Sequence, residues 1–377
     1  MQDLLTPLSE GEALGRLGEA AVLLRTWYQL HARKLPWRET DPPDTYPYRV
    51  WVSEIMLQQT RVEAVIPYYQ WFLDTLPNIP SLAKAEDETL RKLWEGLGYY
   101  SRVRNLKKGA VEVMERFGGQ LPADIGLLKS ISGIGDYTAG AIGSIAFGLR
   151  EPAVDGNLLR VFSRLLAAEG DIARPAVKTA FRDLLREVLS NSRDCPPGDF
   201  NQAVMDIGAT LCLPKNPRCG DCPLASCCLA FERDQASLFP VKAEKKPRRV
   251  EERTVLLLVR DGKVLLRQRP EQGLLAGLWE FPNLDGQCTE EEIRNFLQEQ
   301  GLLPGKMVPL SPAVHLFTHI EWRMTGFLVL CTGKLPDSWA EADIEALQNR
   351  YSLPSAFKVY RKAAEQWLSG EWLLPGK

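Results

Sequence analysis

The stretch ISGIGDYTAGAIG, residues 131–143, places two glycines in a turn between two apolar helical segments. A turn of the form S-G-I-G-D between helices exposes consecutive backbone N–H groups at the start of the second helix. Those groups and the helix dipole can hold one phosphate, and glycine at positions 133 and 135 lets the backbone approach it closely. Taken alone, the turn could also be a plain helix–helix connection.

The stretch RKLWEGLGYYSRVRNLKK, residues 91–108, supports an interaction with nucleic acid. It carries six basic residues against one acidic residue, interleaved with Trp94, Tyr99 and Tyr100. Basic groups and aromatic wedges are what a DNA-kinking surface uses. The net charge of −2 argues against binding through a bulk positive field, but it leaves room for a local basic groove.

The cysteines predict a metal site. The N-terminal sequence has no secretory signal and the apolar runs are too short to span a bilayer, so we expect a cytoplasmic protein with reduced thiols. The segment CLPKNPRCGDCPLASCC, residues 212–228, has the spacing C-x6-C-x2-C-x5-C on Cys212, Cys219, Cys222 and Cys228. Four thiolates in one loop suit zinc or an iron–sulfur cluster. Cys227 is the alternative fourth ligand, although the spacing favours Cys228.

The chain of 377 residues is long enough for two domains, and its patterning changes once. Apolar residues at helical spacing predict helices over residues 20–31, 50–60, 88–96 and 105–117 in a helical domain, residues 1–233. Residues 234–249 are polar, basic and proline-containing, as in a linker. Residues 250–377 predict an α+β domain with a hairpin at Asp261-Gly262, helices over residues 290–301 and near 356–368, and a strand over residues 322–331.

Several motifs together resemble one family. The segments WVSEIMLQQTRV (51–62), GLGYYSRVRN (96–105), AVDGN (153–157) and FNQAVMDIGA (200–209), with the glycine turn and the cysteine spacing, resemble the MutY family of adenine DNA glycosylases. This family lies in the endonuclease III-like branch of the helix–hairpin–helix DNA glycosylase superfamily. The resemblance implies an all-α helix–hairpin–helix glycosylase domain with a [4Fe–4S] cluster in the cysteine loop, and an α+β MutT/Nudix-like C-terminal domain. It also implies a monomer whose substrate is double-stranded DNA containing adenine opposite 8-oxoguanine or guanine.

Two carboxylates are the candidate catalytic groups. Breaking an N-glycosidic bond passes through an oxocarbenium-like state, and adenine leaves poorly unless a ring nitrogen is protonated. Glu54 lies among Trp51, Val52 and Ile55, where desolvation would raise its pKa, although alone it could equally lie on the polar face of a helix. Asp155 precedes a helical run and is a candidate N-cap that stays ionised. The resemblance implies that Glu54 protonates adenine and later activates water, that Asp155 stabilises the sugar cation, and that Asn157 orients Asp155 or the water.

Tyr137 follows the glycine turn at the position where the endonuclease III branch carries a lysine nucleophile. A phenol cannot form a Schiff base, so we expect a monofunctional glycosylase in which the Tyr137 hydroxyl supports the sugar cation. The resemblance further assigns Gln59 and Tyr99 to the base stack and Gln202 to the adenine edge. Arg38, in LPWR, is a predicted DNA contact.

The C-terminal domain is expected to read DNA rather than to hydrolyse nucleotides. In its candidate Nudix helix, RNFLQEQGL (294–302), Asn295 and Gln298 stand where carboxylates would hold magnesium. The segment HLFTH (315–319) resembles the phenylalanine–serine–histidine tip with which the family reads 8-oxoguanine. Phe317, Thr318 and His319 are therefore predicted DNA contacts, with a threonine hydroxyl in place of the serine.

Two other functions compete with this interpretation. An endonuclease III-like glycosylase/lyase for oxidised pyrimidines is disfavoured by Tyr137 and by HLFTH. A non-catalytic binder of damaged DNA would need neither Glu54 nor Asp155.

Overall fold

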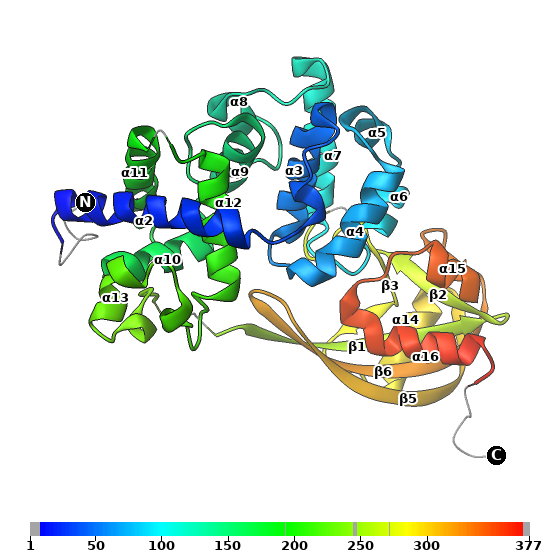
Figure 1. The fold of residues 1–377 in the computed structure, drawn as a ribbon. Coiled ribbons are helices and arrows are strands. Elements are labelled where there is room, and N and C mark those ends of the chain that lie inside the picture. The colour runs from blue at the N-terminus through cyan, green and yellow to red at the C-terminus, as the bar shows by residue number, and fades with distance from the viewer. Residues whose placement is uncertain (1–7, 193, 244–246, 271, 372–377) are drawn as a thin grey trace. The chain divides into compact units, whose positions relative to one another are not determined.

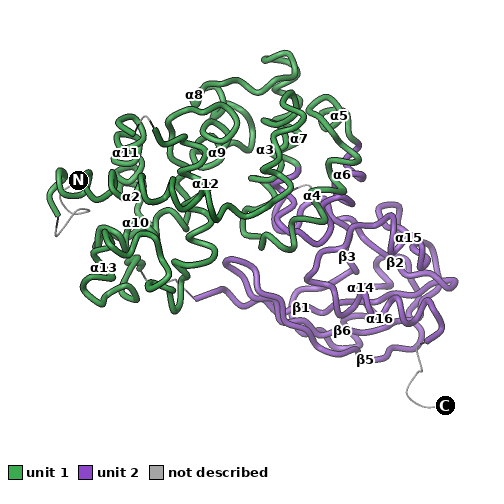
Figure 2. The backbone as a smooth tube through the Cα atoms, viewed as in Figure 1, with its two compact units in different colours: residues 1–85, 104–244 green, residues 86–103, 245–377 purple. Residues whose placement is uncertain are grey.

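The computed structural model describes residues 8–192, 194–243, 247–270 and 272–371. The chain divides into two compact units (Figures 1 and 2), one formed by residues 1–85 and 104–244 and the other by residues 86–103 and 245–377. The segment 86–103, within the predicted helical domain, therefore belongs to the second unit, where Glu95 pairs with Arg361 at 2.6 Å. In the described residues, no helix is long and apolar enough to cross a membrane.

The first unit is helical. Its main elements are α2 (Glu10–His31), η1 (Pro36–Arg38), α3 (Tyr46–Leu57), α4 (Val62–Thr75), α5 (Ile79–Lys84), α7 (Ser101–Phe117), α8 (Ile125–Lys129), α9 (Asp136–Phe147), α10 (Gly156–Leu166), α11 (Pro175–Asn191), α12 (Pro197–Thr210) and α13 (Leu229–Glu232). Helices α2, α10, α11 and α12 share one core, in which Leu17, Phe162, Phe181 and Phe200 are fully buried. This core fixes α10 and α12, which carry much of the site described below.

The predicted helices exist, but several of their ends differ. The helix predicted from residue 50 begins at Tyr46, the one predicted to end at residue 96 ends at Leu93, and the one predicted from residue 105 begins at Ser101. Two further differences have an identifiable cause. Helix α2 starts at Glu10 rather than at residue 20, because Ser9 and Glu12 form a capping box that the apolar pattern does not reveal. Helix α3 ends at Leu57 rather than at residue 60, and Gln59 then adopts a left-handed conformation with φ 59°. A glutamine in this conformation cannot continue a right-handed helix.

The second unit contains α6 (Asp87–Leu93) and a seven-stranded sheet with the order β3-β2-β1-β6-β5, in which β4 pairs with β1 and β7 with β2. The other elements are β1 (Arg249–Arg260), β2 (Lys263–Gln268), β3 (Trp279–Glu280), β4 (Asn283–Asp285), α14 (Glu290–Glu299), β5 (Leu302–Leu316), β6 (Ile320–Gly333), β7 (Trp339–Ala342), α15 (Ile344–Asn349), η6 (Ser355–Phe357) and α16 (Lys358–Leu368). Alternate residues of β1 face two separate cores, one covered by α16 and the other by α14. Helices thus cover both faces of the sheet.

The hairpin predicted at Asp261-Gly262 is confirmed, with both residues at positive φ as a tight turn requires. Strand β5 is absent from the prediction, because Pro304, Pro309 and Pro312 in its sequence read as a loop. The strand lies at the edge of the sheet and pairs with β6 across two register irregularities. Proline is tolerated in such an edge strand.

Candidate active site

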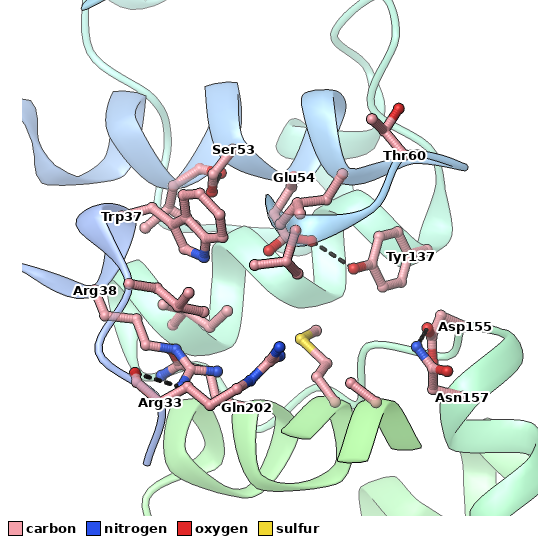
Figure 3. A pocket seen from close by; sticks show the side chains of 17 residues that line it. Arg33, Trp37, Arg38, Ser53, Glu54, Thr60, Tyr137, Asp155, Asn157 and Gln202 are labelled. Carbon is pink, nitrogen blue, oxygen red and sulfur yellow. Dashed lines mark hydrogen bonds between the residues drawn. The ribbon is translucent and has the colours of Figure 1, made fainter. Parts of the chain in front are cut away.

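A cavity of about 160 Å³ in the first unit is lined by all four predicted catalytic residues, Glu54, Tyr137, Asp155 and Asn157 (Figure 3). Side chains reach it from η1, α3, the start of α9, the start of α10, and α12. Its polar lining consists of Arg33, Trp37, Arg38, Ser53, Glu54, Thr60, Tyr137, Asp155, Asn157 and Gln202. Residues far apart in the sequence therefore meet in one cavity.

Glu54 lies on α3, a helix that is buried on nearly every side. Its side chain is 3% exposed and its neighbours Trp51, Val52 and Ile55 are also buried. Burial raises the pKa of Glu54 to about 7, although the Tyr137 hydrogen bond and the Arg38 charge oppose this rise. The carboxyl group can therefore both give and take a proton near neutral pH.

Tyr137 is placed by the first turn of α9, and its hydroxyl donates to Oε2 of Glu54 at 2.5 Å. Burial and the nearby carboxylates raise the pKa of Tyr137 well above its usual value, so the phenol stays protonated. The sequence predicted a hydroxyl acting towards the sugar. The structure adds a contact with the catalytic acid, which sequence alone did not indicate.

Asp155 is the N-cap of α10, as its position before the helical run predicted. Its carboxylate accepts from the N–H of Leu158 at 2.7 Å and from Nδ2 of Asn157 at 2.9 Å. Burial nevertheless raises the pKa of Asp155, and the hydrogen bonds from Leu158 and Asn157 oppose the rise. Capping therefore limits a shift caused by burial, rather than lowering the pKa outright.

Asn157 is held in place by Arg160 and by the close approach of α12. Nη2 of Arg160 donates to Oδ1 of Asn157 at 2.9 Å and to the carbonyl of Gly208 at 2.7 Å. A side chain at position 208 would bring its Cβ within 2.7 Å of the Asn157 Cβ, so glycine is required where α12 passes α10. Asn157 is thus held with its amide directed towards Asp155, and its role in the reaction stays a prediction.

The loop before Asp155 is fixed by a buried amide that the sequence did not single out. Asn201, which is 1% exposed, accepts from the N–H of Ala153 at 2.9 Å and donates to the carbonyl of Glu151 at 2.9 Å. Gly140 allows the same loop to approach α9, because a Cβ there would lie 2.6 Å from the Pro152 carbonyl. Two elements thereby determine where Asp155 begins α10.

Arg33 and Arg38 form a basic wall of the cavity, on the same side as Gln202 (Figure 3). Both arginines donate to Asp206, whose side chain is fully buried one helical turn after Gln202. Arg38 also lies over the ring of Tyr28, 5.4 Å from its centroid.

The glycine turn lies outside the cavity. Ser132 donates its N–H and its hydroxyl to the Glu112 carboxylate, which anchors the turn to α7. Gly133 has φ 83°, and a Cβ at this position would lie 3.0 Å from the Cβ of Asn105. Within the described chain, the N–H groups of Gly133 and Gly135 donate to no protein acceptor, as a phosphate-binding hairpin requires.

The remaining predicted DNA contacts are surface features of the two units. Gln59 is exposed in the first unit, and Tyr99 is 46% exposed in the second, with φ 48°. In the second unit, Thr318 and His319 lie at the tip of a tight turn closed by the Phe317 N–H and the Ile320 carbonyl at 2.8 Å, and the Tyr99 hydroxyl is 3.2 Å from the Thr318 hydroxyl. His315, the first residue of HLFTH, lies before the turn, within β5.

Phe317 anchors this turn through its ring, which packs between His315 and Trp322 at centroid distances of 4.6 and 5.0 Å. Nε of Arg248 donates to the Phe317 carbonyl at 2.8 Å. The two residues at the tip are therefore presented on a fixed base.

The four predicted cysteine ligands line a second, small cavity of about 30 Å³ in the first unit. Cys227 lies outside this lining, and its thiol donates to the Leu224 carbonyl at 3.5 Å. Nη1 of the buried Arg164 donates to the sulfur of Cys212 at 3.3 Å. Among the described residues, no three His, Cys, Asp or Glu side chains converge closely enough to hold a single metal ion.

Comparison with known proteins agrees with this geometry. Residues 52–187 match the HhH-GPD superfamily of base excision DNA repair proteins, and residues 254–363 match the NUDIX domain. The chain is 37% identical to the adenine DNA glycosylases of mouse and human, over 79% and 83% of its length and 68% and 67% of theirs. The chain belongs to the adenine DNA glycosylase family.

The chain is also similar to bacterial relatives and to a solved structure. The adenine DNA glycosylase of Buchnera aphidicola subsp. Schizaphis graminum is 32% identical over 81% of this chain and 86% of its own. A thermostable thymine-DNA glycosylase is 25% identical with a TM-score of 0.50, and it covers 58% of this chain and 98% of its own. The helix–hairpin–helix fold and the Nudix-like second fold predicted from the sequence are thereby confirmed.

Three residues that support the cavity of this adenine DNA glycosylase family member were not predicted from the sequence: Asn201, Arg160 and Asp206. Asn201 and Asp206 both lie in FNQAVMDIGA, the motif that carries Gln202. Their positions along a helix that must be buried could have indicated structural roles, because buried polar side chains need hydrogen-bond partners.

Proposed function

We propose that this protein, acting as a monomer, hydrolyses the N-glycosidic bond of adenine mispaired with 8-oxoguanine or guanine in double-stranded DNA. The observation that carries the proposal is the pair of carboxyl groups in one cavity, of which Glu54 is buried and Asp155 is half-buried. The pKa of Glu54 is raised to about 7 by burial, and this is the value that a group exchanging protons at neutral pH needs.

The reaction begins when adenine is turned out of the helix into the cavity. Glu54 donates its proton to a ring nitrogen, and the electrons of the N-glycosidic bond pass to the leaving base. The carboxylate of Asp155 stabilises the positive charge that develops on the sugar. Glu54, now ionised, takes a proton from water as the water adds to the sugar carbon, which yields free adenine and an abasic site.

Tyr137 and Asn157 position these two groups. The Tyr137 hydroxyl donates to Glu54, which turns one carboxyl oxygen away from the base and leaves the other for proton transfer. Asn157 donates to Asp155 and leaves the capping bond in place. Because position 137 holds a phenol, no Schiff base forms there, and the enzyme is monofunctional.

Recognition uses groups from both units. The Gln202 amide pairs with the adenine edge, and Arg38 borders the same space. The N–H groups at Gly133 and Gly135 bind a phosphate, whereas Gln59 and Tyr99 enter the base stack. Phe317, Thr318 and His319 read the 8-oxoguanine.

The cysteine loop is proposed to hold a [4Fe–4S] cluster through Cys212, Cys219, Cys222 and Cys228. These four thiols line one small cavity with the spacing C-x6-C-x2-C-x5-C, and four thiolates are the ligand set of an iron–sulfur cluster. The Arg164 guanidinium beside Cys212 suits a thiolate ligand. When bound, the cluster would supply four metal–thiolate bonds that order residues 212–228 directly after α12.

Single-turnover kinetics test the proposal on duplexes that place adenine opposite 8-oxoguanine, guanine or thymine, and on a thymine glycol duplex. We expect rapid loss of adenine opposite 8-oxoguanine and guanine, with strand breaks only after alkali. The Glu54→Gln variant should be inactive, whereas Glu187→Gln, an exposed change on α11, should keep wild-type activity.

Two results would contradict the proposal. Breaks without alkali on the thymine glycol duplex would indicate the bifunctional glycosylase/lyase. Binding without base loss on any duplex would leave a damage sensor.

A further inference from the structure

Asp206 is a fully buried carboxylate that does not itself line the cavity. It accepts four hydrogen bonds, of which two come from Arg33, through Nε at 2.6 Å and the backbone N–H at 3.2 Å. The other two come from Nη1 and Nη2 of Arg38, at 2.8 and 2.9 Å. Both of its oxygens are therefore fully engaged by the basic wall of the cavity.

We propose that Asp206 is a positioning residue for adenine excision: it holds Arg33 and Arg38 as one wall of the base pocket and cancels one of their two positive charges. This inference rests on the proposed function, because it concerns the same cavity. It assigns to Asp206 a role distinct from those of the groups that touch the base.

The first part of the argument is geometric. The bidentate pair with Asp206 fixes the plane of the Arg38 guanidinium, and Nη1 of Arg38 also donates to the Arg33 carbonyl at 3.0 Å. Arg38 is further enclosed by the ring of Tyr28. The segment from residue 33 to residue 38 is thereby bound to α12, the helix that carries Gln202. The arginine wall and Gln202 are therefore held in place by the same helix.

The second part is electrostatic. Two arginines in an enclosed cavity oppose the arrival of a proton, whether on Glu54 or on adenine, because positive charge favours the ionised carboxylate and the neutral base. With Asp206 the wall carries a net charge of about +1, and without it about +2, since arginine stays charged in proteins. A base pocket that works by protonating its substrate needs the smaller charge.

Other charged or titratable groups line the same cavity as Glu54. They are Tyr137 from α9, Asp155 from the start of α10, and Arg33 and Arg38 from the segment around η1. Tyr137 and Arg38 lower the pKa of Glu54, and Asp155 raises it. Asp206→Asn leaves Tyr137 and Asp155 unchanged and makes the arginine wall more positive, so its electrostatic effect has a defined sign.

The test measures the single-turnover rate of adenine excision against pH for the wild type and three variants of the full chain. In Asp206→Asn, we expect the rate to fall about 10- to 100-fold from misplacement of the arginines. We also expect the alkaline limb of its pH–rate profile to move to lower pH by about one unit, because a more positive wall favours the ionised form of Glu54. In Arg33→Gln, the limb should move to higher pH, because the wall loses a charge.

The double variant Asp206→Asn with Arg33→Gln restores the net charge but not the contacts. Its limb should return to the wild-type pH while its rate stays low. Glu280→Gln is the matched control, because Glu280 is a buried carboxylate between Arg267 and Arg269 in the second unit. This control is expected to lose stability without moving the limb.

The inference is wrong if the limb stays fixed in Asp206→Asn, or if Arg33→Gln and the double variant fail to move it in the stated directions. If Asp206→Asn does not fold, Arg33→Gln still decides the electrostatic part. Failure of the wild type to excise adenine would instead refute the proposed function, and the two failures are thus distinct.

Discussion

The hydroxyl of Tyr137 and Oε2 of Glu54 lie 2.5 Å apart, and the phenol is the donor. This contact joins the first turn of α9 to the buried face of α3. It stabilises the ionised form of Glu54, and it therefore opposes the rise in pKa that burial causes.

Replacing Tyr137 with phenylalanine should move the pH dependence of adenine excision. The proposed reaction needs protonated Glu54, so the wild-type rate should fall as pH rises through about 7. Without the hydroxyl, the pKa of Glu54 rises further, and the fall should occur about one pH unit higher. Single-turnover rates across the pH range measure this. Tyr48 is also on α3, and its hydroxyl donates to the carbonyl of Leu76, the residue after α4. Tyr48→Phe loses this buried hydrogen bond and should leave the pH of the fall unchanged.

Glu54→Gln should stabilise the fold while it removes activity. The pKa of Glu54 is about 7 in the folded chain and 4.5 ordinarily, so ionisation of the buried group costs stability progressively between these two values. Above pH 7 the variant should gain about 3 kcal/mol in the free energy of unfolding, whereas at pH 4.5 it should gain little. Urea unfolding at both pH values checks this, and an equal gain at the two would contradict it.

Gly208→Ala should slow excision more than it destabilises the protein. The new Cβ would lie 2.7 Å from the Asn157 Cβ, and it would push Asn157 away from Asp155. We expect a loss of about 100-fold in rate and a cost of about 1–3 kcal/mol in stability. Gly18→Ala, where nothing lies within 4 Å, is the control and should keep the wild-type rate.

The adjacent cysteines Cys227 and Cys228 should differ in their effect on bound iron. Cys228→Ser should lose iron and sulfide, because this thiol lines the proposed cluster cavity, whereas Cys227→Ser should retain both. Iron and sulfide analysis of the purified variants, with their visible absorption, gives the answer. Retention of the cluster by Cys228→Ser with loss in Cys227→Ser would reverse the ligand assignment.

The hydroxyl at position 318 should set the preference for 8-oxoguanine over guanine opposite adenine. Thr318→Ser keeps a hydroxyl at the tip of the turn and should keep the ratio of the two excision rates. Thr318→Val keeps the shape without the hydroxyl, so the ratio should fall by up to about tenfold, the value of one hydrogen bond. An unchanged ratio in Thr318→Val would remove this residue from the reading of 8-oxoguanine.

Local patterns in the sequence predicted much of the fold, because amphipathic helices and the hairpin at Asp261-Gly262 each have a recognisable pattern of residues. The start of α2 at Glu10 and the edge strand β5 were not predicted. In the first case a side-chain cap extends the helix beyond its apolar stripe. In the second, an edge position tolerates prolines that would end a central strand.

The residues of the site likewise fall into those that the sequence indicated and those that it did not. Glu54, Asp155 and Tyr137 lie in motifs, and a motif can be compared with a family. Asp206 meets Arg33 from 173 positions away, and Asn201 meets Ala153 from 48 positions away. Such partnerships arise only when helices pack, so a single sequence does not indicate them.

Helix α12 supports three parts of the site through three buried polar side chains. Asn201 holds the loop before Asp155, Gln202 faces the cavity, and Asp206 holds the arginines. A shift of this helix by about 1 Å would disturb all three at once. In a library of all single substitutions scored for repair, residues 197–210 should therefore stand out as the longest run that accepts almost no replacement, and natural variation should accumulate on the opposite surfaces of the unit.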